Sequence, residues 1–408
     1  MGGVSMEWKL KDLTVDGKGS YGIGAPAVPY QEDKLTYLRI TDINNDGSLN
    51  FSDLKSVDAE DAEKYILKEN DIVFARTGNS TGRSYFYEKQ HGTFVYAGFL
   101  IKFSLDPNKV NPKILKYYTH SKPYFDWVNS FDTGATRGNI NAKTYGDMEI
   151  ELPSRKVQDK IVSILSSLDR KIELNNKINA DLEEMAQAIF KNWFVDFEPF
   201  KDGKFVDSEL GMIPEGWKVG RLGEFCKCLL GGTPSRSKEE YWNGDVNWIN
   251  SGEINKFRIL EASEKITELG LAKSATKLLP KKTTVLAITG ATLGQVSLLE
   301  IDTCANQSVI GVLENTEVPY EYIYPFIKDR IEMLIQHQTG GAQQHINKDN
   351  VESLIFLLPA INVLEDYFSL VSPMYKRIES LCFENLYLSL LRDTLLPRLM
   401  SGELEVPE

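Results

Sequence analysis

The sequence has few of the residues that build disulfide frameworks and metal clusters. Its 408 residues contain four cysteines and four histidines. So few cysteines in a chain of this length argue against a disulfide framework, which is typical of short secreted domains. Cys226 and Cys228 stand one residue apart, with no histidine or second cysteine pair nearby. A pair of this kind can ligate zinc, but we expect two ordinary thiols and no metal site.

Long apolar runs and targeting segments are missing as well. No stretch of 18 consecutive apolar residues occurs, so the sequence predicts no membrane-spanning helix. Residues 1–6 lack the basic and apolar regions of a signal peptide. The hydrophobic share of 42% suits a folded protein with apolar cores. We expect a cytoplasmic protein of roughly two to four domains.

Motifs of common enzyme classes are absent too. The chain has no Gly-x-x-x-x-Gly-Lys-Ser/Thr phosphate loop, no His-Glu-x-x-His metal motif and no Gly-x-Ser-x-Gly nucleophile motif. It also lacks the Asn/Asp-Pro-Pro-Tyr/Phe sequence of amino-methyltransferases and the glycine-rich entry of a dinucleotide-binding unit. These absences favour a recognition and assembly protein that has no catalytic residues and no cofactor of its own.

Acidic side chains outnumber basic ones, with 58 Asp and Glu against 46 Lys and Arg and a net charge of −12. A protein that binds a nucleic-acid duplex usually has a basic surface. Any duplex binding would therefore need phosphate contacts concentrated in one local basic region, or partner subunits that supply the positive surface.

What the chain does have is an internal repeat. Residues 8–13 read Trp-Lys-Leu-Lys-Asp-Leu, and residues 217–222 read Trp-Lys-Val-Gly-Arg-Leu. Residues 133–141 read Thr-Gly-Ala-Thr-Arg-Gly-Asn-Ile-Asn, and residues 339–347 read Thr-Gly-Gly-Ala-Gln-Gln-His-Ile-Asn. A duplicated chain can present two similar surfaces, as a reader of two half-sites on a duplex would need.

Each repeat is predicted to be a mixed α/β region followed by a long helix. In the first repeat we predict one helix over residues 112–127 and strands over residues 36–40, 71–75, 93–96, 99–103 and 148–152. In the second we predict one helix over residues 320–336 and strands over residues 246–250, 284–288, 308–313 and 355–359. The predicted fold class is therefore α/β, with two tandem domains related by a pseudo-two-fold.

The stretch after each α/β region has apolar residues at alternating spacings of three and four, which predicts a coiled-coil helix. We expect the two helices to pair in antiparallel orientation, although each could instead pack on its own domain. Asn175 and Asn385 interrupt the two apolar stripes, and Pro373 is expected to kink or restart the second helix. The predicted interface residues are Ile161, Ile164, Leu168, Asn175, Ile178, Leu182, Met185, Phe368, Val371, Ile378, Leu381, Asn385, Leu388 and Leu395.

The Gly- and Thr-rich segments 77–82 and 289–294, which follow predicted strands, are candidate nucleic-acid contacts. Glycine lets the backbone approach a phosphate, hydroxyls donate to it, and Arg, Asn and Gln can read base edges. The alternative is a set of tight turns that hold the repeat together. The candidates are Arg76, Thr77, Asn79, Thr81, Arg83, Arg137, Asn139, Ser235, Arg236, Lys238, Thr289, Thr292, Gln343, Gln344 and His345.

In this order, these features resemble the specificity subunit of Type I restriction–modification systems over the whole chain. The resemblance rests on the paired Trp-Lys-x-x-x-Leu starts, the Thr-Gly-x-x-x-Gly loops, the Thr-Gly-x-x-x-x-x-Ile-Asn segments and the Leu-Pro ends before the long helices. The linker over residues 203–217 and the ending Pro-Arg-Leu-Met-Ser-Gly-Glu-Leu over residues 397–404 are also similar to that family.

The resemblance implies a DNA-binding protein in which each of two target-recognition domains reads one half of a bipartite site in double-stranded DNA, with the antiparallel helices as a spacer. It implies assembly with two methyltransferase subunits, which bind S-adenosylmethionine and modify adenine, and with restriction subunits that use ATP. None of these activities would reside in this chain. Two alternatives remain: a DNA-modifying enzyme, either a nuclease or a methyltransferase, with an unrecognised active site, and a coiled-coil assembly protein without a nucleic-acid role.

The repeat and the resemblance together predict the domain boundaries. The predicted segments are a first recognition domain over 6–153, a first spacer helix over 154–197, a linker over 198–216, a second recognition domain over 217–359, a second spacer helix over 360–400 and a tail over 401–408.

Overall fold

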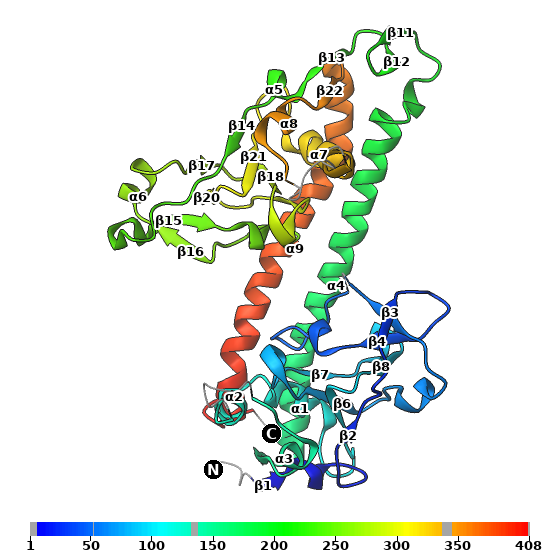
Figure 1. The fold of residues 1–408 in the computed structure, drawn as a ribbon, viewed down its shortest axis with the longest axis vertical. Coiled ribbons are helices and arrows are strands. Elements are labelled where there is room, and N and C mark those ends of the chain that lie inside the picture. Colours follow the sequence, from blue (N-terminus) through cyan, green and yellow to red (C-terminus); the bar gives the residue numbers. More distant parts are fainter. Residues whose placement is uncertain (1–5, 52, 132–137, 337–344, 407–408) are drawn as a thin grey trace. The chain divides into compact units, whose positions relative to one another are not determined.

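The computed structural model describes residues 6–51, 53–131, 138–336 and 345–406 (Figure 1). The chain divides into two compact units, of which the first comprises Met1–Lys171 with Leu388–Glu408 and the second comprises Ile172–Tyr387. Each unit therefore contains one predicted recognition domain together with part of each long helix. Among the residues that the structure describes, no helix is both long enough and apolar enough to cross a membrane.

The first unit contains two four-stranded sheets. The first sheet has the order β2-β9-β6-β7, formed by Ser20–Tyr21, Leu100–Ser104, Asp71–Ala75 and Ser84–Phe86. The second has the order β3-β5-β4-β8, formed by Ala27–Pro29, Lys55–Val57, Thr36–Leu38 and Phe94–Tyr96. Strand β4 pairs with β8 in parallel, and the other pairings are antiparallel.

The second unit repeats this plan. Its sheet β14-β21-β18-β19 is formed by Cys228–Leu230, Val309–Val312, Thr284–Ala287 and Val296–Leu298. Its sheet β16-β15-β20-β17 is formed by Glu264–Ile266, Trp242–Ile249, Thr303–Ala305 and Leu278–Leu279. Strand β15 pairs with β20 in parallel, as β4 does with β8 in the first unit. The repeat seen in the sequence is thus a repeat of sheet topology.

The Trp-Lys and Leu-Pro motifs mark a two-stranded ribbon that closes each domain. In the first unit, β1 (Met6–Lys9) pairs with β10 (Glu149–Leu152) in antiparallel register. In the second unit, β13 (Lys218–Arg221) pairs with β22 (Ile355–Leu358) in the same way. The ribbon joins the first and last strands of each domain. The two motifs therefore recur together in each repeat, because they lie on strands that pair with each other.

One helix of the first recognition domain differs from prediction, whereas its counterpart in the second does not. The helix predicted over 112–127 is broken into α1 (Pro112–Tyr118) and α2 (Lys122–Asn129), with Ser121 as the residue before α2 and a proline in its first turn. The counterpart α7 (Tyr320–Gln336) is continuous through Pro325. Short helices α3 (Ala142–Gly146), α5 (Leu222–Phe225), α6 (Glu268–Ala272) and α8 (Lys348–Glu352) complete the two domains.

The long helices are α4 (Arg155–Phe194) and α9 (Ile361–Met400), each of 40 residues. Helix α9 continues through Pro373, so the prediction that this proline restarts the helix is wrong. The side chain of Pro373 is exposed, and the ring can be accommodated at the cost of one backbone hydrogen bond. The linker over residues 198–216 contains an antiparallel hairpin of β11 (Phe205–Ser208) and β12 (Gly211–Pro214).

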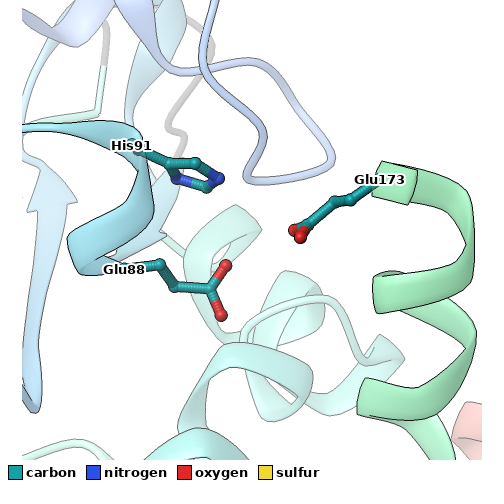
Figure 2. A group of neighbouring side chains, drawn as sticks. All are labelled: Glu88, His91 and Glu173. Atoms are coloured by element: carbon teal, nitrogen blue, oxygen red, sulfur yellow. The ribbon is translucent and has the colours of Figure 1, made fainter. Parts of the chain in front are cut away.

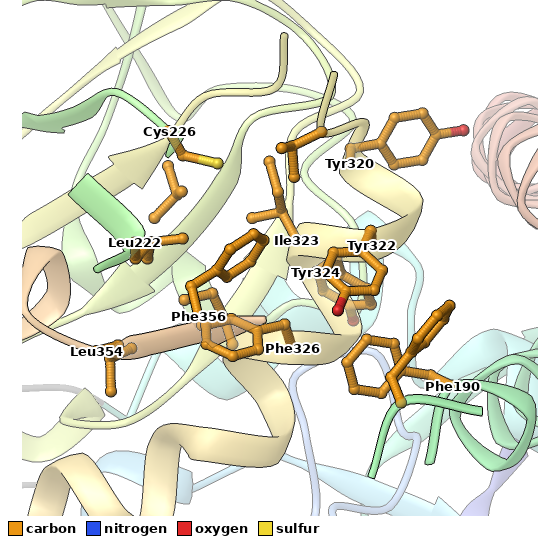
Figure 3. Packing of buried hydrophobic residues seen from close by; sticks show 14 of the residues in the cluster. Phe190, Leu222, Cys226, Tyr320, Tyr322, Ile323, Tyr324, Phe326, Leu354 and Phe356 are labelled. Atoms are coloured by element: carbon orange, nitrogen blue, oxygen red, sulfur yellow. The ribbon is translucent and has the colours of Figure 1, made fainter. Parts of the chain in front are cut away.

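Each unit has a large apolar core that includes helix residues as well as domain residues. In the second unit, the ring of Tyr322 on α7 lies 5.5 Å from Phe356 on β22 and 5.3 Å from Phe190 on α4, measured between ring centres (Figure 3). In the first unit, Leu165 of α4 and Leu396 of α9 belong to one buried cluster with the domain residues. The long helices are therefore part of both cores.

The cysteines belong to these interiors. Cys226 and Cys228 are both buried free thiols in the core of the second unit. Burial raises the pKa of each thiol to about 12, because an apolar environment disfavours the thiolate. Both side chains are therefore protonated and unreactive at neutral pH.

Candidate nucleic-acid interface

The Gly- and Thr-rich loops after β6 and β18 have the same backbone. Thr77 has φ −151° and ψ 159°, and Thr289 has φ −148° and ψ 160°. Gly78 and Gly290 both have φ +72°, and each begins a turn of 3-10 helix, Gly78–Ser80 in the first unit and Gly290–Thr292 in the second. The sequence motif therefore specifies one loop conformation that is used twice.

The last glycine of each loop is required by both conformation and packing. Gly82 has φ +87° and Gly294 has φ +84°, values that side chains other than glycine rarely adopt. A Cβ atom added to Gly82 would approach Val128 of α2 closer than 3.0 Å, and one added to Gly294 would approach Ile335 of α7 equally closely. Each loop is thus fixed against the helix of its own domain.

A second segment lies beside each loop. In the first unit, the Ile140 amide donates to the Arg76 carbonyl at 2.9 Å, and Thr77 forms a bridge with Asn139. In the second unit, the Ile346 amide donates to the Ile288 carbonyl at 3.0 Å. The two repeated motifs of the sequence, far apart in the chain, therefore meet at one place in each domain.

The side chains at this place in the first unit are polar and basic. Arg76 Nη2 donates to Asn139 Oδ1 at 3.4 Å, and the Arg76 guanidinium lies 5.0 Å from the ring centre of Tyr21 on β2. Its buried Nε has no hydrogen-bond partner among the described residues. Arg83 Nη1 donates to the Ile43 carbonyl at 2.9 Å. The first unit therefore gathers two arginines and an exposed asparagine around the loop.

The hydroxyl candidates are less available than the sequence suggested. Thr81 Oγ1 donates to the carbonyls of Gly78 and Gly138, at 2.8 and 2.9 Å. This contact favours the alternative in which Thr81 holds two loop segments together. Thr77, Thr289 and Thr292 are half-buried, whereas Asn79 is exposed at the tip of its loop.

In the second unit, Ser235, Arg236 and Lys238 are already engaged with neighbouring side chains. Arg236 makes a bidentate ion pair with Glu264, with Nη2 donating at 2.9 Å, and its guanidinium lies 3.6 Å from the ring centre of Trp242. Lys238 Nζ donates to the Tyr241 hydroxyl at 3.0 Å. Ser235 Oγ shares a hydrogen bond with Ser237 Oγ. A nucleic acid would have to displace Glu264 to use both guanidinium nitrogens of Arg236.

The remaining candidates lie in the second repeated segment. His345 is exposed and lies next to Ile346, whose amide contacts the loop of the second unit. Arg137, Gln343 and Gln344 lie outside the described residues.

The predicted helix interface is partly displaced from the buried face of the helices. Of the predicted residues, those that are buried are Ile161, Asn175, Val371, Ile378 and Leu381, and those that are half-buried are Leu168, Ile178, Leu182, Phe368, Asn385, Leu388 and Leu395. Ile164 is 36% exposed and Met185 is 51% exposed, so these two predicted interface residues do not lie on the buried face of α4. Leu165 and Ala186 are buried instead, because α4 packs on the recognition domains as well as on α9.

Within the second unit, the two helices run antiparallel. Asn175 Nδ2 donates to Asn385 Oδ1 at 2.9 Å, Asn179 Nδ2 donates to Cys382 Sγ at 3.4 Å, and the ring centres of Trp193 and Tyr367 lie 6.0 Å apart. Positions later in α4 therefore meet positions earlier in α9. The two asparagines that interrupt the apolar stripes contact each other.

Two buried carboxylates of α4, which are not among the predicted site residues, pair with cations of the recognition domains, and one of them also pairs with a cation of α9. In the first unit, Asp169 accepts from the Tyr117 hydroxyl at 2.9 Å and pairs with Lys116 and Arg392, both at 3.1 Å. In the second unit, Glu183 pairs with Arg258 at 2.8 Å and with Lys328 at 2.9 Å. The sequence signal that indicates such a carboxylate is an acidic residue on the apolar face of a helix.

The balance of burial and charge sets the ionisation of these two carboxylates. Burial alone would raise the pKa of Asp169, but Lys116 and Arg392 outweigh it and hold that pKa below its usual range. Burial opposes ionisation of Glu183 in the same way, and Arg258 and Lys328 hold its pKa low. Both carboxylates are therefore charged at neutral pH, and they bind each domain to α4.

Acidic side chains elsewhere in the first unit also serve ion pairs. Glu88, just before the turn Lys89–His91, lies 3.5 Å from the ammonium groups of both Lys113 and Lys116. His91 Nδ1 shares a hydrogen bond with the Tyr85 hydroxyl at 3.0 Å. Figure 2 shows the side chains of Glu88 and His91 at this turn.

Comparison with known proteins identifies one family. The family model of the Type I restriction modification DNA specificity domain matches residues 9–184 and again residues 214–380. The chain is 29% identical over 299 residues to the specificity subunit of the Type I restriction enzyme MjaIX from Methanocaldococcus jannaschii. This alignment covers 72% of this chain and 69% of that protein. The chain is 24% identical over 434 residues to the HindI specificity subunit from Haemophilus influenzae, in an alignment that covers 91% of this chain and 94% of that protein.

A solved structure has the same fold. The crystal structure of the Type I restriction–modification S subunit from M. genitalium matches with a TM-score of 0.58 and 15% identity, over 99% of this chain and 97% of that chain. At this identity the likeness concerns the fold alone. The family match, in contrast, recurs in tandem and covers most of the sequence. The chain belongs to the family of Type I restriction–modification DNA specificity proteins.

Proposed function

We propose that this chain is the DNA specificity subunit of a Type I restriction–modification complex and that each recognition domain reads one half of a bipartite duplex site. The observation that carries the proposal is the repeated loop. Two domains of one family have the same loop backbone, yet the side chains around it differ, with Arg76 and Asn139 in one unit and Ile288 and His345 in the other. Two domains with the same loop backbone but different side chains around it suit two different half-sites.

The side chains around these loops can be divided into candidates for base contacts and candidates for phosphate contacts. Arg76 and Asn139 are the candidates for base contacts of the first domain, since Arg pairs with guanine and Asn with adenine in the major groove. Asn79, Thr77 and Arg83 are candidates for phosphate contacts of that domain. In the second domain, His345 would contact bases, and Thr289, Thr292, Ser235, Arg236 and Lys238 would contact the backbone.

We assign catalysis to partner subunits. The relatives are named as specificity subunits of restriction enzymes, which implies other subunits that cut or modify DNA. Two methyltransferase subunits would carry S-adenosylmethionine, and restriction subunits would use ATP. The net charge of −12 supports this division, because partners that enclose the duplex would supply positive surface that this chain lacks.

We propose that α4 and α9 act as the spacer that sets the distance between the half-sites. Both helices have 40 residues, and the asparagine pair between them gives a defined register. We retain residues 6–153 and 217–359 as the two exchangeable recognition domains. The ribbons β1–β10 and β13–β22 support these bounds, because each joins the first and last strands of a domain.

Methylome sequencing tests the proposal. Cells that carry this chain together with its methyltransferase subunits should acquire adenine methylation in a motif of two short blocks separated by a fixed gap. Cells that carry the methyltransferase subunits alone should lack that motif. A continuous motif, or the same motif without this chain, would contradict the proposal.

A further inference from the structure

Tyr21 and Leu230 occupy the same place in the two recognition domains. Tyr21 on β2 pairs with Ile101 of β9, which in turn pairs with Phe74 of β6. Leu230 on β14 pairs with Ile310 of β21, which in turn pairs with Leu286 of β18. Phe74 and Leu286 each lie three residues before the threonine that begins the repeated loop. The sheet topology therefore makes Tyr21 and Leu230 equivalent.

The residue after each of them confirms the alignment. Gly22 and Gly231 lie so close to a neighbouring backbone that a Cβ atom would meet carbonyl oxygens, those of Tyr96 and Ala97 in one unit and those of Asn306 and Ala305 in the other, closer than 3.0 Å. The preceding side chain is thus held at one position on the domain surface. Tyr21 is 42% exposed there and Leu230 is 40% exposed.

In the first unit, Tyr21 supports the loop residues that we propose as base readers. Its ring centre lies 5.0 Å from the Arg76 guanidinium, and its hydroxyl accepts from the Ala142 amide at 3.1 Å. Arg76 in turn donates to Asn139 at 3.4 Å. An arginine beside an aromatic face is held in a restricted plane, which suits two parallel hydrogen bonds to a base.

In the second unit, the same positions have different chemistry. The counterpart of Arg76 is Ile288, because both carbonyls accept from the isoleucine of the second repeated segment. Ile288 is buried, whereas Leu230, the counterpart of Tyr21, is 40% exposed. Arg83 is replaced by the exposed Gln295, whose amide donates to Thr292 as that of Arg83 donates to Ser80. The second domain thus offers an apolar contact where the first offers a guanidinium.

We propose that this position, on β2 of the first domain and β14 of the second, determines specificity. Tyr21 is a positioning residue that holds Arg76 for a bidentate contact with guanine, and Leu230 contacts the methyl group of thymine directly. The proposal rests on the proposed function, because it assumes that this face of each domain meets DNA. Arginine is the commonest partner of guanine, and apolar side chains recognise the thymine methyl group.

The test uses the full chain co-expressed with its methyltransferase subunits and methylome sequencing of each variant. Y21L should lower the preference for guanine at one position of the first half-site about ten-fold or more, with the second half-site unchanged. Y21F keeps the ring beside Arg76 and should keep that preference. L230Y should lower the preference for thymine at one position of the second half-site only.

The control is V15A. Val15 is 68% exposed, and its amide contacts Ser104, at the opposite end of β9 from Leu100 and the loop. This variant should leave both half-sites unchanged. The inference is overturned if Y21L and L230Y lower methylation equally at all sequences, or if the motif of both variants matches that of the unaltered chain.

Failure of this inference can be told from failure of the proposed function. If the unaltered chain gives no split motif, the proposed function fails. If it gives a split motif that neither variant changes, the proposed function stands and the role of Tyr21 and Leu230 is refuted. If Y21L fails to assemble, L230Y still tests the inference. Leu230 is 40% exposed, so the larger tyrosine side chain can be placed there without disturbing the core.

Discussion

Asn175 of α4 donates a hydrogen bond from Nδ2 to Asn385 Oδ1 of α9 at 2.9 Å, and Asn385 donates in turn to Asn176 at 2.7 Å. Asn175 is fully buried. A buried polar pair of this kind weakens an apolar helix interface but favours one register over others, because any slip would leave the amides without partners.

This pair leads to the first prediction, on stability. N175A should lower the free energy of unfolding of the helix pair by about 1–3 kcal/mol, since it removes a fully buried hydrogen-bond donor and leaves the half-buried Asn385 Oδ1 without it. The double variant N175L/N385L should be more stable but less selective in its pairing, with self-association seen by sedimentation. K177A, at an exposed position of α4, should change stability by less than about 0.5 kcal/mol. A stable, strictly monomeric double variant would argue against a role of the pair in register.

The second prediction concerns Glu183. E183Q removes the charge that pairs with Arg258, whose side chain is 1% exposed, and with Lys328. Arg258 then keeps its longer ion pair with Glu300, at 3.9 Å, and this poorly compensated buried cation should cost about 3 kcal/mol of stability in the second unit. Hydrogen exchange of α7 and β18 measures this loss directly. E184Q changes the neighbouring exposed carboxylate and should leave exchange unaltered; equal protection in both variants would contradict the assigned role of Glu183.

The third prediction is a pH dependence. The pKa of Asp169 is lowered in the folded protein, so its contribution to stability is present above the unfolded value of about 3.9 and is lost as pH falls through the folded value. D169N should therefore be less stable than the unaltered chain at pH 7, and the difference should shrink below about pH 4. Denaturant unfolding at several pH values measures it. A difference that stays constant down to pH 2 would show that the charge of Asp169 is not what stabilises the contact.

The fourth prediction concerns the loop glycines. G82A and G294A should each cost about 1–3 kcal/mol and weaken DNA binding of one half-site, because each adds a strained φ and a clash with a helix. G290A adds strain without a clash and should cost less. The matched control is G24A, since a Cβ at Gly24 meets nothing within 4 Å and its φ is not positive. Full binding by G82A and G294A would show that the loop conformation is dispensable.

Much of the fold could be predicted from local pattern. Strand Asp71–Ala75 and helix Tyr320–Gln336 lie where their apolar periodicity indicated, because regular burial leaves a regular sequence. The break between α1 and α2 and the continuity of α9 through Pro373 were not predictable with equal ease. Both depend on how the tertiary environment tolerates a proline, which a local pattern does not contain.

The candidate site was predictable in part, for a related reason. The repeated loops pointed to Arg76 and Asn139, since duplication in the sequence marks a shared frame. Tyr21 and Leu230 could not be found that way, because they differ between the repeats and become equivalent only through strand pairing. The buried face of α4 also depends on domain packing, so an apolar pattern alone does not indicate that Met185 is 51% exposed while Ala186 is buried.

The most direct test of the central claim is an exchange of one recognition domain. Residues 217–359 would be replaced by the corresponding residues of the Haemophilus influenzae relative, and the methylome of cells with this chimera and the original methyltransferase subunits would be sequenced. We predict a split motif in which one block changes and the other block is retained. A motif that is unchanged in both blocks would contradict the account.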